Sequence, residues 1–255
     1  MSKVHVPKFN EVFMKAVELY KGNFKALFYI AVVASVIREL LQIMINKMGM
    51  NHILSIAEKG GVAAVQAQVS VGVMFQIVIF ACVSGLVWLF AHAACMILLN
   101  NSWRNRGSSF RVMVRILLSC AFALIFASLV AKILISFGLM LYIIPGIIIG
   151  TLLFVYVPSI LFDGRGTFSS LQHSFQLVKG NFGSTIWMCI ITFFLIILPE
   201  FIGMLIRGSG AMSNMQFGID EVAIIFISSL VLPLISALIL TQYYALRTMH
   251  ENKDN

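Results

Sequence analysis

Six long runs of apolar residues limit what this chain can fold into. Each run is at least as long as the roughly 20 residues that a helix needs to cross a bilayer. Hydrophobic residues make up 60% of the 255 positions and charged residues 11%, against about 45–50% and about 25% in soluble domains. A soluble fold cannot cover that much apolar surface, so the sequence predicts an integral membrane protein.

The runs predict an all-α, polytopic membrane fold. Backbone groups in hydrocarbon must be satisfied within a helix or a closed barrel, and none of the runs alternates as barrel strands do. We expect a single membrane domain over residues 1–255, with six transmembrane helices in three hairpins. The third and fourth helices are joined tightly around Ser136-Phe137-Gly138, and residues 46–71 form the longest outer loop. The expected spans are Phe24–Ile45, Gly72–Leu99, Arg115–Phe137, Leu139–Phe162, Gly183–Ile206 and Val222–Leu246.

Two amphipathic helices are expected to lie on the cytoplasmic surface of the membrane, over residues 7–21 and 167–179. In both segments apolar side chains recur at helical spacing, with charged or polar side chains on the opposite face. Thr167 is the expected N-cap of the second helix. The apolar stripe of this second helix is expected to consist of Phe168, Leu171, Phe175 and Val178.

Each amphipathic helix ends in the same four letters, because Lys21-Gly22-Asn23-Phe24 returns as Lys179-Gly180-Asn181-Phe182. We interpret the tetrapeptide as a corner that turns an interfacial helix into a spanning one. Glycine would end the first helix in a left-handed conformation, and asparagine would cap the next. Lysine would reach lipid phosphate while phenylalanine enters the apolar edge. A fainter copy without the Lys-Gly-Asn corner begins at Gly107, so we expect three repeated units.

The distribution of lysine and arginine predicts that both termini are cytoplasmic. Of the 18 basic residues, 13 fall in segments on the same side as the N-terminus, four on the other side, and Arg38 within the first span. Such a bias marks the cytoplasmic side of a membrane protein. The 13 are Lys3, Lys8, Lys15, Lys21, Lys25, Arg104, Arg106, Arg111, Arg115, Arg165, Lys179, Arg247 and Lys253.

Four ionisable side chains within the spans are the candidate site. They are Arg38 and Glu39 in the first span, Lys132 in the third and Glu200 in the fifth, each in the outer half of its helix. Charges at membrane depth are costly and are functional candidates by default. We expect the two glutamates to share the two cations. Two interpretations stay open: a polar cluster that lines an outward-facing cavity for a lipid headgroup or an ion, and a set of ion pairs that fixes the register of the bundle.

No other pattern predicts catalysis or a metal. His92 and Cys95 share a helical face, but no second pair stands at ligand spacing and a structural zinc needs four ligands. Asp163-Gly164-Arg165-Gly166 is interpreted as a turn, since it lacks the pattern of a nucleotide-binding loop. Gly146 and Gly150 favour close helix packing, with a partner inside the chain. We expect no catalytic residue, no metal and no cofactor.

One stretch carries a resemblance to a known family. The letters LYIIPGIIIGTLLFVYVPSILFDGRGTFSSLQHSFQLVKGNF combine a Pro-Gly-Ile opening, a second proline, a Gly-containing turn and a Ser-bearing helix that ends in an Asn corner. This pattern, with the basic ending YYALRTMHENK, resembles the YciC-type family of uncharacterised bacterial inner-membrane proteins. It is also similar to the membrane domain attached to some glycerophosphodiester phosphodiesterases. The resemblance implies a place in the bacterial inner membrane and brings no activity or catalytic residue.

We therefore expect a non-enzymatic inner-membrane protein that binds lipid or organises envelope partners. A transporter or permease-like component with an outward-facing polar cavity is the alternative, and a lipid-modifying enzyme is a third class. Membrane lipids are the expected partners, with other envelope proteins as a second kind. Nucleic acid is not expected, because no basic patch interleaved with exposed aromatics stands out. The ligand and the oligomeric state are open at this point.

Overall fold

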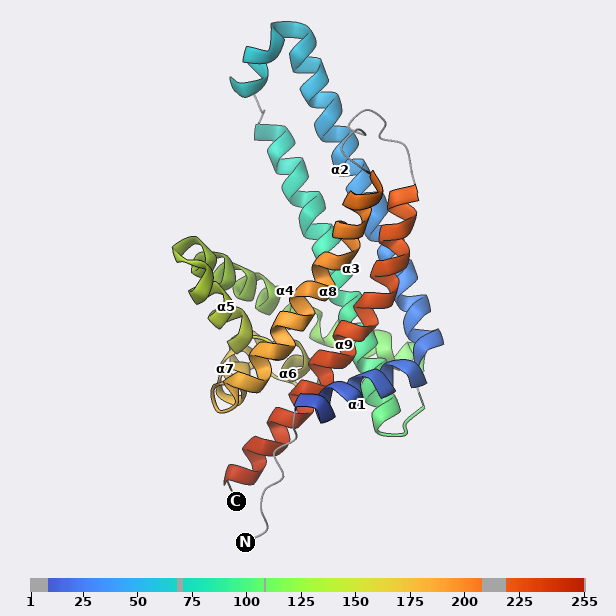
Figure 1. Ribbon diagram of the computed structural model, residues 1–255, viewed down its shortest axis with the longest axis vertical. Helices are drawn as coiled ribbons and strands as arrows, with labels where there is room; N and C mark the ends of the chain where they lie inside the picture. The colour runs from blue at the N-terminus through green and yellow to red at the C-terminus, as the bar shows by residue number, and fades with distance from the viewer. Residues whose placement is uncertain (1–8, 68–70, 108, 208–218, 255) are drawn as a thin grey trace.

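The computed structural model describes residues 9–67, 71–107, 109–207 and 219–254, apart from the side chains of residues 46, 48–67, 71–77, 207 and 252–254. Every regular element in these residues is a helix (Figure 1). The helices are α1 (Phe9–Gly22), α2 (Phe24–Ala67), α3 (Val71–Trp103), α4 (Phe110–Leu141), α5 (Ile143–Leu152), α6 (Tyr156–Asp163), α7 (Thr167–Lys179), α8 (Phe182–Arg207) and α9 (Ile219–Asp254).

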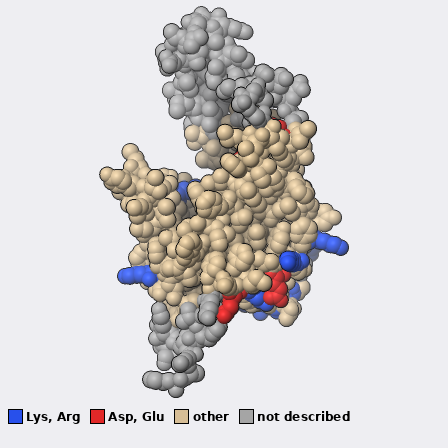
Figure 2. All heavy atoms as spheres, in the orientation of Figure 1, with Lys and Arg blue, Asp and Glu red and all other residues tan. Residues whose placement is uncertain are grey.

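Six stretches of these helices are long and apolar enough to cross a membrane. They lie in α2, α3, α4, α5 with α6, α8 and α9, which confirms the expected all-α, polytopic membrane fold. Figure 2 shows a wide uncharged surface, with most of the visible charged side chains near the end where α9 finishes. This division matches an apolar belt in hydrocarbon and a charged end in water.

Helix α9 is the centre of the molecule. It packs along α8, α2 and α3, and α1 crosses its C-terminal part (Figure 1). Leu232, Leu238 and Leu240 of α9 are fully buried. A helix that is apolar on all sides reaches this position because each of its faces can be covered by a neighbour.

The fourth span is broken into α5 and α6, and is not the single helix that the sequence predicts. Pro158 has no N–H to donate to the carbonyl of residue 154, so the chain leaves the helical path over residues 153–155. Ser174 of α7 closes the gap, since its Oγ accepts a hydrogen bond from Val155 N at 3.2 Å and donates one to Leu152 O at 2.9 Å. The break is therefore stabilised by a side chain from another helix.

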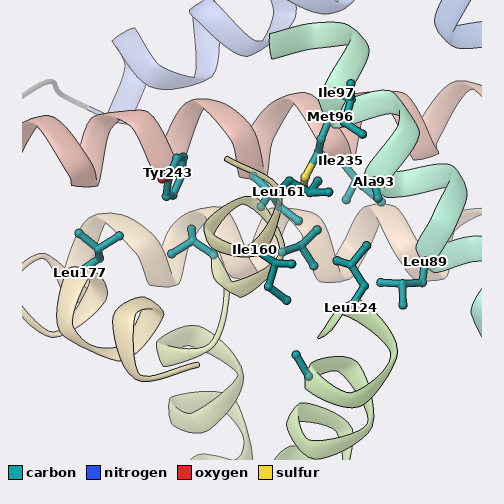
Figure 3. Packing of buried hydrophobic residues seen from close by; sticks show 14 of the residues in the cluster. Leu89, Ala93, Met96, Ile97, Leu124, Ile160, Leu161, Leu177, Ile235 and Tyr243 are labelled. Atoms are coloured by element: carbon teal, nitrogen blue, oxygen red, sulfur yellow. The ribbon is translucent and has the colours of Figure 1, made fainter. Parts of the chain in front are cut away.

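The two halves of the broken span have different surroundings. Helix α6 inserts among α3, α4, α7 and α9, where Ile160 and Leu161 point into the main core cluster (Figure 3). Helix α5 pairs instead with α4. The hairpin of α4 and α5 points away from the other long helices (Figure 1), and Figure 2 shows the surface hollowed beside it. We call this hairpin the arm.

Close contact between two glycines holds the arm together. A Cβ placed on Gly138 would lie 2.9 Å from Gly146 Cα, and one on Gly146 would lie 2.5 Å from the Leu139 side chain. The helix-packing partner of Gly146 is thus inside the chain, as expected. The turn of the arm is at Tyr142, which is extended, and not around Ser136-Phe137-Gly138. Helix α4 continues past those residues because Gly138 can pack face to face against α5.

The first hairpin also differs from its prediction. Residues 46–67 continue α2 as helix, where a loop was expected. The segment becomes polar after Ile45 but holds no proline that would end a helix. The drop in hydropathy after Ile45 indicates where the apolar part of α2 ends. It does not indicate where the helix itself ends.

Both corners form with right-handed backbone, so the left-handed glycine that we expected is wrong. Gly22 has no positive φ, and Gly180 has φ −76° and ψ −15°. Tight bonds close the corners instead, from Asn23 N to Tyr20 O at 3.3 Å and from Asn181 N to Val178 O at 2.9 Å. Asn23 precedes α2 at the expected position, but its side chain donates to Leu19 O and to Ser102 Oγ, which ties the corner to α1 and α3.

The amphipathic segments are helices, as α1 and α7, but α7 is rotated from its predicted orientation. Its N-cap position is Gly166, one residue before the expected Thr167. Phe168 is 75% exposed and Phe175 41%, because the face turned to α5 and α6 carries the serine that closes the break. The residues of α7 that are buried are Ser170, Leu171, Ser174, Leu177 and Val178.

The middle repeat unit shows no interfacial helix in the residues that the structure describes. Helix α3 continues to Trp103 and α4 begins at Phe110, so the connection is too short for one. A threefold internal repeat therefore stays a prediction.

Candidate functional site

Three of the four predicted intramembrane charges meet between α2 and α8. Arg38 Nη2 lies 3.1 Å from Glu200 Oε1 and 3.6 Å from Glu39 Oε2. The guanidinium also lies over the ring of Trp88 of α3, 5.5 Å from its centroid. We call Arg38, Glu39 and Glu200 the outer cluster. It connects three helices through one arginine, whose planar fork suits both carboxylate pairing and ring stacking.

The three side chains of the outer cluster differ in how far they are exposed. The Glu39 side chain is 7% exposed and that of Arg38 23%, whereas that of Glu200 is 58% exposed. Glu200 follows Pro199 on a face of α8 that other helices do not cover. The cluster thus reaches from the interior of the bundle to its surface.

Lys132 lies apart from the outer cluster, contrary to the expected sharing of two cations. Its Nζ lies 3.2 Å from the position that a Cβ on Gly85 of α3 would occupy. The side chain is exposed, and the described residues give it no carboxylate within ion-pair distance. The reason for the separation is the arm, because α4 diverges from the bundle and carries Lys132 with it.

Two buried hydroxyl groups, one on α2 and one on α9, were not recognised from the sequence. Ser35 of α2 and Ser228 of α9 are each 1% exposed, and neither Oγ has a hydrogen-bond partner in the described structure. The Nε atom of Arg38 is buried and unpartnered as well. Buried polar groups are nearly always hydrogen-bonded, so each exception calls for a physical reason.

A second polar cluster lies at the end of the bundle where α9 finishes, around the last residue of α6. Asp163 Oδ2 accepts a hydrogen bond from Tyr243 at 2.6 Å, and Asp163 Oδ1 accepts one from Arg247 at 2.9 Å. His173 Nδ1 is 3.5 Å from Asp163 Oδ2. We call Asp163, His173, Tyr243 and Arg247 the inner cluster. Our interpretation of residues 163–166 as a turn is confirmed by Gly164, which has φ 62°.

Ser159 lies beside the histidine and the aspartate of the inner cluster, but the three side chains are not arranged as a catalytic triad. A triad needs the serine on one imidazole nitrogen and the carboxylate on the other. Here Ser159 Oγ and Asp163 Oδ2 both approach Nδ1 of His173, at 3.2 Å and 3.5 Å. Ser159 is also fully buried and donates to Val155 O. The arrangement fixes the ends of α6, α7 and α9 against one another.

Burial, reinforced by the positive charge of Arg165, lowers the pKa of His173 from its usual value of about 6.5. The neighbouring Asp163 acts in the opposite direction but is outweighed. This shift favours the neutral imidazole, which suits the hydrogen-bonding position of the partly buried His173.

His92 and Cys95 pack as interior residues of α3. His92 Nδ1 lies 2.8 Å from Ser236 Oγ of α9, and Cys95 is fully buried. No group of three or more His, Cys, Asp or Glu side chains suited to a metal occurs in the described part of the chain. All four cysteines are free thiols.

No known protein-family model matches this chain, and neither a curated protein nor a solved structure matches it. The resemblance to the YciC-type family therefore stays a prediction, and the function has to be argued from the site.

Proposed function

We propose that the chain is a non-enzymatic protein of the bacterial inner membrane that binds an anionic lipid in the hollow beside the arm. Lys132 is the observation that carries this proposal. It is a cation within a spanning helix, exposed, next to Gly85, and without a carboxylate partner among the described residues. A lipid with a negative headgroup supplies the missing charge from outside the protein.

The physical argument is the cost of an unpaired charge at membrane depth. Charged side chains in spans are paired with another group or lie in a polar cavity. Lys132 stands ten residues before the turn at Tyr142 (142 − 132), about 15 Å along α4, and its flexible stem lets the ammonium group reach part of the way toward the headgroup region. The absence of a side chain at Gly85 leaves room for the ammonium group between α3 and α4.

Apolar side chains on the arm supply the surface that acyl chains need. Leu129 lies one turn before Lys132 on the same side of α4, and Leu129, Ile133 and Leu134 are all exposed. Acyl chains bind such surfaces through burial of apolar area, at about 25 cal/mol per Å². A lipid whose headgroup contacts Lys132 and whose acyl chains lie along the arm would contact both the charged group and the apolar side chains.

The inner-membrane location and cytoplasmic termini belong to the same proposal. The positive-inside bias of the sequence supports the orientation, and the resemblance to the YciC-type family supports the membrane. Helices α1 and α7, with lysines at their ends, would then lie at the cytoplasmic headgroups.

Native mass spectrometry on protein released from nanodiscs tests the proposal. The nanodiscs hold equal amounts of phosphatidylglycerol, which is anionic, and phosphatidylethanolamine. We expect the wild type to retain phosphatidylglycerol preferentially. Lys132→Gln should weaken this retention about tenfold or more, because a charge-assisted contact contributes about 1.5–3 kcal/mol.

Two matched variants make the result specific. Lys132→Arg should keep the preference, and Lys47→Gln, which removes another exposed lysine toward the outer end of α2, should leave it unchanged. Equal retention of the two lipids by the wild type, or an undiminished preference in Lys132→Gln, would contradict the proposal.

Transport is the second candidate, and the outer cluster favours it. The cluster extends from buried Glu39 to exposed Glu200, so it could give a solute a polar route into the bundle. Single cysteines at these two positions, in a chain without its native cysteines, should then react with a small membrane-impermeant thiol reagent. A cysteine at Glu39 that stays unreactive under all conditions would count against transport.

A further inference from the structure

The connection between α3 and α4 is rich in arginine and has no acidic residue near it in the sequence. Its arginines, with those of the first two turns of α4, are Arg104, Arg106, Arg111 and Arg115, and the 10 acidic residues of the chain all lie outside residues 59–162. Arg104 donates to Tyr244 Oη at 3.3 Å. The described residues give Arg106, Arg111 and Arg115 neither a hydrogen-bond partner nor an ion-pair partner for the side chain.

This connection lies beside the amphipathic helix α1 (Figure 1). Lys15 Nζ of α1 stands 5.8 Å from the centroid of the ring of Trp103, the last residue of α3. Asn23, which follows α1, donates to Ser102 Oγ at 2.9 Å. Tryptophan and amphipathic helices are typical of the boundary between a membrane and water. The arginines therefore stand near the layer of lipid headgroups.

The side chains that flank these arginines are apolar and exposed. Phe110 and Val112 lie on either side of Arg111, and they are 76% and 48% exposed. Arginines among exposed apolar side chains are typical of a surface that contacts lipid. Exposure to water alone would explain the arginines, but it would not explain these neighbours.

An apolar stripe continues from the arginines along the same face of α4. Side chains three or four residues apart on a helix share a face. The exposed residues at this spacing are Arg111, Arg115, Leu118, Phe122 and Phe126. The opposite face is occupied, because Leu124 and Ala127 are buried in the main core cluster. One uncovered face thus carries two guanidinium groups at its start and an apolar surface directly after them.

We propose that this face of α4 binds a phospholipid whose headgroup carries two phosphates, as in cardiolipin. Arg111 and Arg115 have Cβ atoms about 6 Å apart, and each guanidinium can hold a phosphate through paired N–H donors. A headgroup with one negative charge would neutralise only one of them. The acyl chains lie along Leu118, Phe122 and Phe126, and a soluble polyanion would leave that surface unused.

The site is distinct from the hollow at Lys132. Arg111 and Lys132 stand 21 residues apart on α4 (132 − 111), which is about 30 Å along the helix. One headgroup cannot contact both. The inference goes beyond the proposed function and does not depend on it.

A competition between two anionic lipids tests the proposal. The full-length protein is placed in nanodiscs of phosphatidylethanolamine that contain phosphatidylglycerol and cardiolipin at equal total negative charge. Native mass spectrometry of the released protein identifies the lipids that it retains. We expect the wild type to retain cardiolipin in excess. The double variant Arg111→Gln/Arg115→Gln should reduce this excess about tenfold or more, because it removes the charge-assisted contacts to both phosphates.

A control with the same loss of charge makes the result specific. Lys15→Gln/Arg165→Gln also removes two cations at this end of the bundle, but Glu18 and Asp163 lie 2.9 Å and 3.9 Å from those two side chains. This control should keep the cardiolipin excess. The single variants Arg111→Gln and Arg115→Gln should each show a smaller decrease than the double variant, and they carry the test if the double variant does not fold.

Three results would overturn the proposal. The first is a wild type without a cardiolipin excess, and the second is an excess that survives in Arg111→Gln/Arg115→Gln. The third is an equal decrease in the charge control, which would mean that only net charge matters. Pyrophosphate should not displace the retained lipid, and displacement would contradict a contribution from the apolar stripe. Lys132→Gln should keep the excess, so failure of the lipid site at Lys132 and failure of this one remain distinguishable.

Discussion

Gly164 and Gly22 show that one residue type can stand in a turn for different reasons. Gly164 ends α6 with φ 62°, a conformation that costs an L-residue about 1–2 kcal/mol. Gly22 is helical, and a Cβ on it would meet nothing within 4 Å. We therefore expect Gly164→Ala to lower the free energy of unfolding by about 1 kcal/mol and Gly22→Ala to leave it unchanged or raise it slightly. Equilibrium unfolding in mixed micelles measures the free energy of unfolding of both variants. Equal decreases in the two variants would show that position 22 requires glycine.

His173 gives the inner cluster a pH dependence. Because burial and Arg165 lower its pKa in the folded protein, the unfolded chain binds a proton at this position more readily below about pH 6.5. The corresponding stability is fully present above that pH and is lost as the pH falls. Thermal unfolding at about pH 7.5 and pH 5 should show a smaller decrease in Tm for His173→Gln than for the wild type.

The difference between the two proteins is the measured quantity, since the other four histidines are common to both. An identical decrease in Tm in wild type and variant would mean that His173 titrates in the folded protein as it does in the unfolded chain.

At the scale of the elements, the break in the fourth span depends on Ser174. Ser174→Ala would leave Val155 N–H and Leu152 C=O without their hydrogen bonds in a buried region. We expect this variant to lose about 2–3 kcal/mol of unfolding free energy. Ser170→Ala on the same helix is the control, because that hydroxyl is equally buried but donates only to Thr167 O of its own turn. A loss no larger than that of the control would contradict this account of the break.

The elements also show what could be predicted from sequence. The six spans follow from apolar length, which is a local property of the chain. The break at residues 153–155 was missed although Pro158 was visible, because the group that stabilises it lies about 20 residues further on. Residues 46–67 were expected to form a loop because the sequence becomes polar after Ile45, and we took that change as the end of α2. A helix can continue into water, because its backbone hydrogen bonds do not require apolar side chains.

At the scale of the whole molecule, long-range pairing limits what a single sequence can tell. Arg38 and Glu200 were both singled out, and their contact joins residues 162 positions apart. Lys132 was grouped with them on charge alone and lies elsewhere, because the direction of the arm follows from how α6 packs into the core. The partners of Asp163 were missed for the same reason, since Tyr243 and Arg247 approach from the other end of the chain.

The central claim is that the hollow beside the arm holds an anionic lipid whose headgroup contacts Lys132. The most direct measurement uses a phosphatidylglycerol analogue with a photoreactive group near its headgroup, followed by mapping of the labelled peptides in nanodiscs. The account predicts labelling concentrated around Gly85 of α3 and Lys132 of α4 and strongly reduced in Lys132→Gln. Labelling spread evenly over the lipid-exposed faces, including the α8 face that carries Trp187 and Phe194, and unaffected by that substitution would contradict it.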